Sequence, residues 1–265
     1  MALQKSWRWV GAFGPEMMLC VAHARVGVLR RSWWAVWDGE RLHEGRRAPF
    51  ELSLEHGTPI EVTTGPAWTR KTPLRVTGNV LGRSIDLPGL LDESAGRHAR
   101  RTAWRWSAGA GVAESGAAVV WNLVEGLHDR SPSERTVWVD GAPHEVEALP
   151  FDGLARVGDL RFDALATRAK RENYLVIASD YEQPFGTFAG TKLSAQQQLS
   201  SMLLVDGYVQ HHIRQSLQLG FISETGQSQD GGDDYQSASW RSITPHPRSS
   251  PATGNEPVKA PKGCS

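Results

Sequence analysis

The chain has few cysteines, no long apolar run and no excess of either charge. Its two cysteines, Cys20 and Cys264, lie near opposite ends of the sequence, and Cys20 falls in the apolar run MMLCV. A buried thiol behaves as a small hydrophobe, so we expect no structural disulfide and a reducing, cytoplasmic location. The N-terminus lacks the apolar core of a secretory signal. No run approaches the roughly 20 apolar residues of a membrane-spanning helix, so no integral membrane segment is predicted.

The charge balance and the missing motifs exclude several classes of function. Lys plus Arg and Asp plus Glu both number 29. Nucleic-acid binding favours a basic excess, so we predict no nucleic-acid partner, although the arginines and tryptophans of 97–106 resemble a single-strand platform. The chain contains no GxGxxG, P-loop or GxSxG element, which argues against nucleotide-binding folds and α/β-hydrolases. Its histidines lack metal-ligand spacing, so we expect neither a metal nor a cofactor.

Short β-rich runs separated by Gly and Pro fill the chain up to Thr191. Turn signals about ten residues apart are typical of an antiparallel sandwich or barrel rather than of βαβ units. Asp38-Gly39, between Trp37 and Leu42, is a type I′ hairpin signal. A second hairpin is predicted through Asp140-Gly141, and further strands are expected at 159–166, 173–179 and 186–189.

Residues 97–106 alternate as one strand would. One parity carries His98, Arg100, Thr102, Trp104 and Trp106, and the other carries small and cationic residues. Successive side chains of a strand point to opposite faces, so the first set is expected to share an aromatic face. Such a face either belongs to the core, since Trp buries a large area, or lines a ligand cavity.

Residues 117–125 predict a second buried strand beside that face. Asn122 lies on one parity, and Trp121, Leu123 and Glu125 lie on the other. A buried Asn must be hydrogen-bonded, so Asn122 is either a structural clamp or a ligand contact. Glu125 ends the strand, and His128 follows in a charged loop. Asp92 and Glu93, adjacent on a strand, are expected to point to opposite faces.

The composition changes after Thr191. Residues 192–222 could form weak amphipathic helices, and we interpret them as a linker. From Ser223 onward too little apolar surface is present to offset the entropy of ordering, which predicts a disordered tail over 223–265. The part before it is divided, by prediction, into an N-terminal β unit over 1–72 and a second unit over 73–191 that carries the site.

Several motifs together resemble one known family, the bacterial domain of unknown function 2804 family, over about residues 1–191. The resemblance depends on WRWVGAFGPEMMLC…RVG (7–27), AWTRK (67–71), DESAG…TAWRWSAG (92–109), WNLVEG (121–126), SERTVWVDG (133–141) and QPFGTFAGT (183–191). Two features depart from the family pattern. Arg97 replaces a Tyr, and the chain continues past Thr191 with KLSAQQQ where family members have closing strands.

The resemblance implies an all-β fold of two lipocalin-like (calycin-like) units around a cavity for an apolar molecule. The family is itself similar, at a distance, to the lipocalin-like group that contains carotenoid 1,2-hydratases. The resemblance implies no particular reaction. Our preferred hypothesis is an apolar, lipid-like ligand, with any chemistry being acid/base hydration, isomerisation or cyclisation. The candidate proton handlers are His98 and Glu125, and the candidate ligand contacts are Arg100, Thr102, Trp104, Trp106, Asn122 and His128. A binding module without turnover and a C-terminally disrupted, inactive product remain open alternatives, and the oligomeric state is not predicted.

Overall fold

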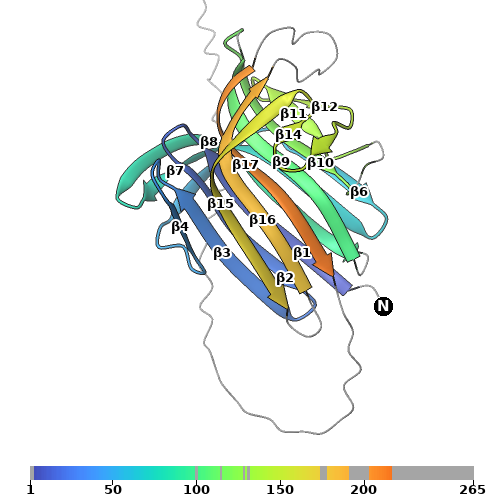
Figure 1. The fold of residues 1–265 in the computed structure, drawn as a ribbon. Helices are drawn as coiled ribbons and strands as arrows, with labels where there is room; N and C mark the ends of the chain where they lie inside the picture. Colours follow the sequence, from blue (N-terminus) through green and yellow to red (C-terminus); the bar gives the residue numbers. More distant parts are fainter. Residues whose placement is uncertain are drawn as a thin grey trace, which may run out of the picture.

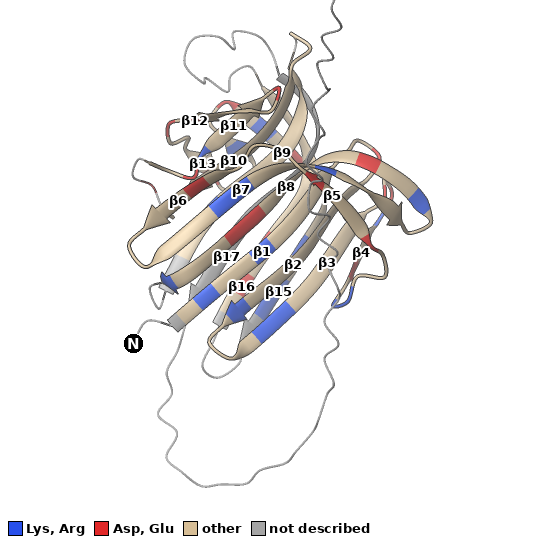
Figure 2. Cartoon of the chain, turned by 180° about the vertical axis from the view of Figure 1, so that it is seen from behind, with Lys and Arg blue, Asp and Glu red and all other residues tan. Residues whose placement is uncertain are grey.

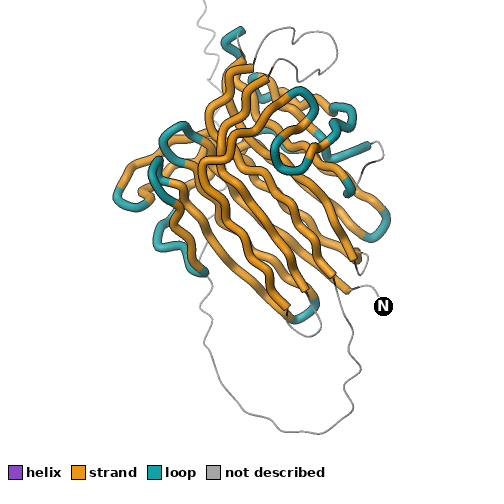
Figure 3. The backbone as a smooth tube through the Cα atoms, viewed as in Figure 1, coloured by secondary structure: helices purple, strands orange, loops and turns teal. Residues whose placement is uncertain are grey.

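The computed structural model describes residues 3–98, 101–113, 115–127, 129, 132–173, 178–190 and 203–216. Only the backbone is described at residues 3, 98, 101, 102, 172, 173, 178 and 203–216. These ranges contain strands, turns and loops but no helix (Figure 3), so they include no helix that could cross a membrane. Every strand pairing is antiparallel, which confirms the predicted all-β, antiparallel fold class.

The first sheet contains the strands up to residue 98, in the order β4-β3-β2-β1-β8-β7-β5, with β6 also paired to β7. The strands are β1 (Leu3–Phe13), β2 (Met18–Val26), β3 (Leu29–Trp37), β4 (Leu42–Gly45), β5 (Leu52–His56), β6 (Ile60–Thr64), β7 (Ala67–Val80) and β8 (Arg83–His98). Most neighbours in this sheet are also neighbours in sequence, as in a meander of hairpins. There are two exceptions: β5 pairs with β7, and β1 pairs with β8 and so joins the two ends of the segment.

The second sheet contains the remaining strands, in the order β12-β11-β10-β9-β17-β16-β15-β14-β13. The strands are β9 (Arg101–Ala113), β10 (Ala118–Glu125), β11 (Thr136–Val139), β12 (Ala142–Glu145), β13 (Phe151–Asp152), β14 (Arg156–Val157), β15 (Leu160–Asn173), β16 (Ala178–Gly190) and β17 (Leu203–Ser216). Figure 1 shows β15, β16 and β17 lying across the strands of the first sheet. Contacts of β17 with β1 and β2 agree with that view.

Three hydrophobic clusters account for the packing of the two sheets. One lies between the sheets and combines Trp9, Cys20 and Trp37 of the first with Trp106 and Phe185 of the second. Each sheet also curls around an apolar cluster of its own, one including Leu19 and Val76 and the other Trp121 and Phe162. Because strand side chains alternate between faces, both faces of each sheet bury apolar residues.

The boundary between the sheets differs from the predicted division of the chain. It falls between β8 and β9, whereas the predicted boundary between residues 72 and 73 lies inside β7. Residues 97–106, predicted as one strand, are shared between β8 and β9, which hydrogen-bond within different sheets. Alternation alone specifies neither where a strand ends nor which partner it takes, so the pattern could not reveal this change of sheet.

The two predicted hairpins have different turns. Asp140 and Gly141 both have positive φ, at 49° and 81°, and link Val139 directly to Ala142, which is the geometry of a type I′ turn. Trp37 and Leu42 also pair as expected, but a four-residue loop joins them. The type I′ prediction there is wrong, because φ is positive only at Gly39 and not at Asp38.

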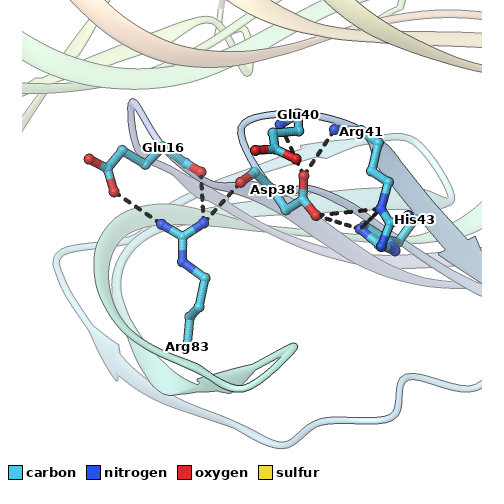
Figure 4. A network of polar contacts seen from close by, with 6 residues as sticks. All are labelled: Glu16, Asp38, Glu40, Arg41, His43 and Arg83. Carbon is cyan, nitrogen blue, oxygen red and sulfur yellow. Dashed lines mark hydrogen bonds and ion pairs between the residues drawn. The ribbon is translucent and has the colours of Figure 1, made fainter.

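A hydrogen-bond network at Asp38 stabilises the alternative loop (Figure 4). The Asp38 Oδ1 atom accepts hydrogen bonds from the backbone N–H groups of Glu40 and Arg41, at 3.0 and 2.9 Å. Its Oδ2 atom lies 2.6 Å from His43 Nε2. Arg83 donates to the Asp38 carbonyl oxygen, which ties this loop to the β7–β8 turn. The carboxylate thus organises the loop that a type I′ turn would have replaced.

Residues 203–216 correct the prediction of a weakly helical linker over 192–222. They form β17, which pairs with β9 on one side and β16 on the other. The apolar residues of this segment fit a helical or an extended spacing equally, and the unpaired backbone groups of two neighbouring strands favour the extended form. A strand therefore joins β9 to β16 within the second sheet, in a segment where the sequence was expected to depart from the family pattern. The predicted tail over 223–265 lies outside the described residues.

Candidate functional site

The predicted site is only partly visible in the described residues. Arg100 and His128 lie outside them. His98 ends β8 and Thr102 lies in β9, and only their backbones are described. The proposed roles of these four residues therefore stay predictions.

The two predicted tryptophans of β9 face the first sheet. Trp106 is 4% exposed, and its ring meets the ring of Trp9 edge-to-face with centroids 4.7 Å apart. Trp104, two residues earlier on the same face, is half-buried and packs against the same cluster. The aromatic face predicted for 104 and 106 is thus the inner face of the second sheet.

Asn122 is fully buried, and both polar atoms of its side-chain amide are hydrogen-bonded. Its Oδ1 atom accepts a hydrogen bond from the indole N–H of Trp106 at 2.6 Å, and its Nδ2 donates to the Glu134 carbonyl oxygen at 2.6 Å. These two contacts join β9, β10 and the segment that precedes β11. Asn122 therefore acts as the structural clamp that was one of its two predicted roles.

Glu125 is separated from Asn122 by the sheet. Leu123, two residues before Glu125, packs on the outer cluster of the second sheet, whereas Val124 packs between the sheets. The Glu125 carboxylate pairs with Arg105 directly across β9, at 2.6 Å, and both side chains are more than one third exposed. The structure therefore does not bring Glu125 together with Asn122 or Trp106.

A buried ionic cluster, not predicted from the sequence, lies between the sheets. It consists of Thr69, Lys71, Asp92 and Glu134. Lys71 Nζ contacts Asp92 Oδ1 on the neighbouring strand and lies 2.8 Å from Oε2 of Glu134, in the segment that precedes β11. Thr69 donates its hydroxyl to the same Glu134 oxygen at 2.9 Å. The exposed fractions of the side chains are 4% for Lys71, 10% for Asp92 and 3% for Glu134.

Two carboxylates of this ionic cluster, those of Asp92 and Glu134, contact the one ammonium group of Lys71. Burial raises the pKa of Asp92 and the charge of Glu134 adds to that effect, while Lys71 opposes it. Burial alone would lower the pKa of Lys71, but the two carboxylates outweigh it and its pKa is raised. Asp92 thus keeps its proton to a higher pH than an exposed Asp does, beside a lysine whose own pKa is raised.

The register of β7, β8 and β1 explains how the ionic cluster forms. Lys71 lies directly opposite Asp92, and Arg8 lies directly opposite Glu93. Arg8 pairs with Glu93 at 2.7 Å on the other face, so the adjacent carboxylates point apart as expected. The cluster residues come from three of the family-like runs, AWTRK, DESAG and SERT. Those runs were the available signal, but strand register was needed to bring them together.

Three half-buried tryptophans, Trp7, Trp33 and Trp104, lie at the edge of the inter-sheet core, and we refer to them as the tryptophan rim. All three pack against the inter-sheet core. The rings of Trp7 and Trp33 lie 5.4 Å apart, and the Trp7 side chain also hydrogen-bonds to Asp92. The buried acid therefore lies next to partly exposed aromatic surface.

A second polar cluster lies farther along the same interface. Gln183 contacts the Cys20 thiol, with Nε2 to Sγ at 3.4 Å, and accepts a hydrogen bond from the Tyr181 hydroxyl. Arg168 stacks over the rings of Trp33 and Tyr181, with distances of 5.4 and 4.9 Å from its guanidinium carbon to the ring centroids. Burial raises the pKa of Cys20 to about 11, which keeps the thiol protonated. Among the described residues, no His, Cys, Asp or Glu group is placed to hold a metal.

Comparisons with known proteins confirm the family resemblance. The profile of the family described as domain of unknown function (DUF2804) matches residues 79–208. This match includes Asp92, Asn122 and Glu134 and extends beyond Thr191 into β17. No curated protein matches the sequence.

Two solved structures align with most of this chain at low similarity. CghA aligns with a TM-score of 0.39 and 11% identity, covering 82% of this chain and 89% of its own. Kievitone hydratase from Nectria haematococca aligns with a TM-score of 0.37 and 12% identity, covering 78% and 88%. Similarities at this level carry no inference about function, which has to come from the residues of this chain.

Proposed function

We propose that this chain binds an apolar, lipid-like small molecule against the tryptophan rim and transfers a proton to it from Asp92. One observation carries the proposal: a buried carboxyl group with a raised pKa lies beside partly exposed indole rings. Of the three ionisable members of the cluster, Asp92 has the largest exposed fraction, 10%. It is therefore the member that a molecule held by the rim would reach first.

The chemistry that fits this arrangement is non-redox acid/base work. A protonated carboxyl group can donate its proton to a carbon–carbon double bond, and the resulting cation then takes up water, loses a neighbouring proton or is attacked by a second double bond. These outcomes are hydration, isomerisation and cyclisation. Indole faces stabilise such cations through their quadrupole. Trp7 of the rim contacts the acid, and Trp33 packs against Trp7.

The other members of the ionic cluster would tune and position the acid. Glu134 disfavours ionisation of Asp92 by like charge, and Lys71 holds the carboxyl group in place. Asn122 fixes the Glu134 backbone. His98, the proton handler predicted from the sequence, stays a proposal that His98→Ala tests in the same assay.

The experiment is deuterium transfer, because it detects turnover even when the substrate has not been identified. The full-length protein is incubated in D2O with the apolar extract of the source cells, and products are analysed by mass spectrometry. We expect carbon-bound deuterium with the wild type and with Glu93→Gln, and loss of at least roughly 100-fold with Asp92→Asn, the range usual for removing a general acid. Glu93→Gln is the matched control, since it changes the adjacent carboxylate on the opposite face.

Asp92→Asn activity equal to wild type, in a folded protein, would refute the assignment of the acid. A second candidate function is a binding module without turnover. It is favoured by the internal pairing of the ionic cluster, which links the sheets whether or not chemistry follows. In that case native mass spectrometry would detect a bound apolar molecule, Trp104→Ala would weaken its binding, and no variant or wild type would incorporate deuterium.

A further inference from the structure

We propose that the β2–β3 hairpin tip docks on an anionic lipid surface. The tip is the segment Arg25–Arg31. Val28 at its apex is 89% exposed and Leu29 is 37% exposed, which makes Val28 the most exposed of the large apolar side chains described. Gly27, with φ of 60°, turns the chain and donates its N–H to the Gln4 carbonyl oxygen at 2.9 Å. The backbone thus holds an apolar apex out in solvent.

The charge around this apex has one sign. Residues 17–37, the whole β2–β3 hairpin, contain three arginines and no carboxylate. Arg25 and Arg30 lie directly opposite each other in the ladder, an arrangement that destabilises a sheet through repulsion. Arg25 Nε donates to the Gly27 carbonyl oxygen at 2.7 Å, which keeps its guanidinium group at the turn. A surface of phosphate groups would relieve this repulsion and complement the charge.

Neighbouring strands extend the basic edge. Lys5 of β1 pairs in register with Val26, and Arg97 of β8 pairs with Gln4. Four adjacent strands, β3, β2, β1 and β8, therefore end in cationic residues on the same side of the molecule. Figure 2 shows Lys and Arg segments gathered toward these strand ends, near the N-terminus.

The exposed apolar apex favours a bilayer over a nucleic acid. Each basic residue near an anionic membrane is attracted to the lipid headgroups, and apolar side chains add binding free energy by entering the region below the headgroups. A nucleic acid would satisfy the arginines but offers no apolar phase to Val28 and Leu29. The combination of both features at one tip fits a peripheral membrane contact.

The position of the tip connects it to the proposed site. Leu29 and Trp33 are four residues apart on one face of β3, a span of about 13 Å at the rise of a strand. From Trp33, a row of register partners leads across β2 to Trp9 and then to Asp92. An apolar molecule leaving the bilayer at the tip would meet the tryptophan rim next. This delivery step rests on the proposed function, whereas docking itself does not.

The test is sedimentation of the full-length protein with vesicles. We expect binding to vesicles of roughly 30% phosphatidylglycerol in phosphatidylcholine, and little binding to pure phosphatidylcholine. Arg25→Gln/Arg30→Gln should weaken partitioning roughly 30-fold, taking about 1 kcal/mol per Arg near an anionic surface and about 1.4 kcal/mol per tenfold change. Val28→Ser/Leu29→Ser should weaken it as well, and about 0.5 M NaCl should reduce binding of the wild type.

The control is Arg46→Gln/Arg47→Gln, which removes the same charge from an exposed pair of arginines in another loop and should bind like the wild type. Equal binding by the two double arginine variants would overturn the proposal, as would equal binding to neutral vesicles. A single-stranded oligonucleotide that competes as well as vesicles of equal phosphate content would assign the tip to nucleic acid instead. Asp92→Asn should sediment like the wild type, so failure of docking and failure of the proposed chemistry are distinguishable.

Discussion

Replacing Lys71 by Met tests the balance of charge in the ionic cluster. The substitution keeps the length of the side chain and removes the ammonium group that Asp92 and Glu134 share. Two carboxylates, both nearly inaccessible to water, are then left facing each other between the sheets. Removing one partner of a buried ion pair costs roughly 3–5 kcal/mol of unfolding free energy. For a chain of this size that corresponds to a decrease in melting temperature of roughly 6–20 °C.

The pH dependence of this loss has a definite sign. The raised pKa of Asp92 contributes stability that is present below its unfolded pKa, near 3.8, and is lost as the pH rises through the folded value. Without Lys71 the folded pKa of Asp92 rises further, because the ammonium group that opposes the shift is gone. Protonation relieves the buried carboxylates, so the difference between Lys71→Met and wild type should be larger at about pH 7.5 than at about pH 4.5.

The matched control is Arg70→Met, one residue earlier on the same strand. Arg70 pairs with Glu61 on the exposed face, where both side chains are nearly half exposed, and such pairs contribute about 1 kcal/mol or less. Urea and thermal unfolding of the three proteins at both pH values give the comparison. A loss for Lys71→Met that equals that of Arg70→Met, or that is the same at both pH values, would refute the reasoning.

Three further predictions concern the surrounding structure. Asn122→Ala should lower the unfolding free energy by roughly 1–3 kcal/mol, because it removes the hydrogen bond that the buried indole N–H of Trp106 donates to Asn122 Oδ1. Urea denaturation measures the loss, and a value below about 1 kcal/mol would contradict the prediction. Asp38→Asn should destabilise the protein at neutral pH but not in strong acid. Hydrogen bonds hold the pKa of Asp38 well below its usual range, so the stability that its carboxylate contributes is lost only as the pH falls through that lowered value. Melting temperatures of both proteins, measured over a series of acidic pH values, test this. In a Cys264→Ser variant, Cys20 should react with iodoacetamide in mild alkali only as fast as the protein unfolds, because the thiol is buried and its pKa is raised to about 11. Fast labelling of the folded protein would argue against the packing between the sheets.

Most strands could be predicted from the sequence because strand formation depends on local patterns. Alternation and turn residues specified the antiparallel architecture, and Asp140-Gly141 formed the expected turn. Asp38-Gly39 did not, because a carboxylate that accepts two backbone N–H groups stabilised a longer loop. Leu203–Ser216 was also missed, since only its two partner strands favour the extended form.

The candidate site was harder to predict from the sequence because it depends on the register between paired strands. Asn122 and Trp106 were predicted from the sequence and do meet, but Glu125 was placed with them although its parity put it on the other face. Lys71 lies in β7 of the first sheet and Glu134 in the segment before β11, far apart in the sequence, and no local pattern links them. Their contact follows only from how two sheets pack, which single-sequence periodicity does not encode.

The place of β17 in the second sheet has a consequence for synthesis of the protein. β9 and β16 become bridged only when the segment that follows both of them has emerged from the ribosome. Until then a nascent chain carries two incomplete strand edges, while all strands of the first sheet are already available for pairing. Ribosome stalling before residue 203 should therefore leave a half-assembled chain that is more dependent on chaperones than one stalled after residue 216.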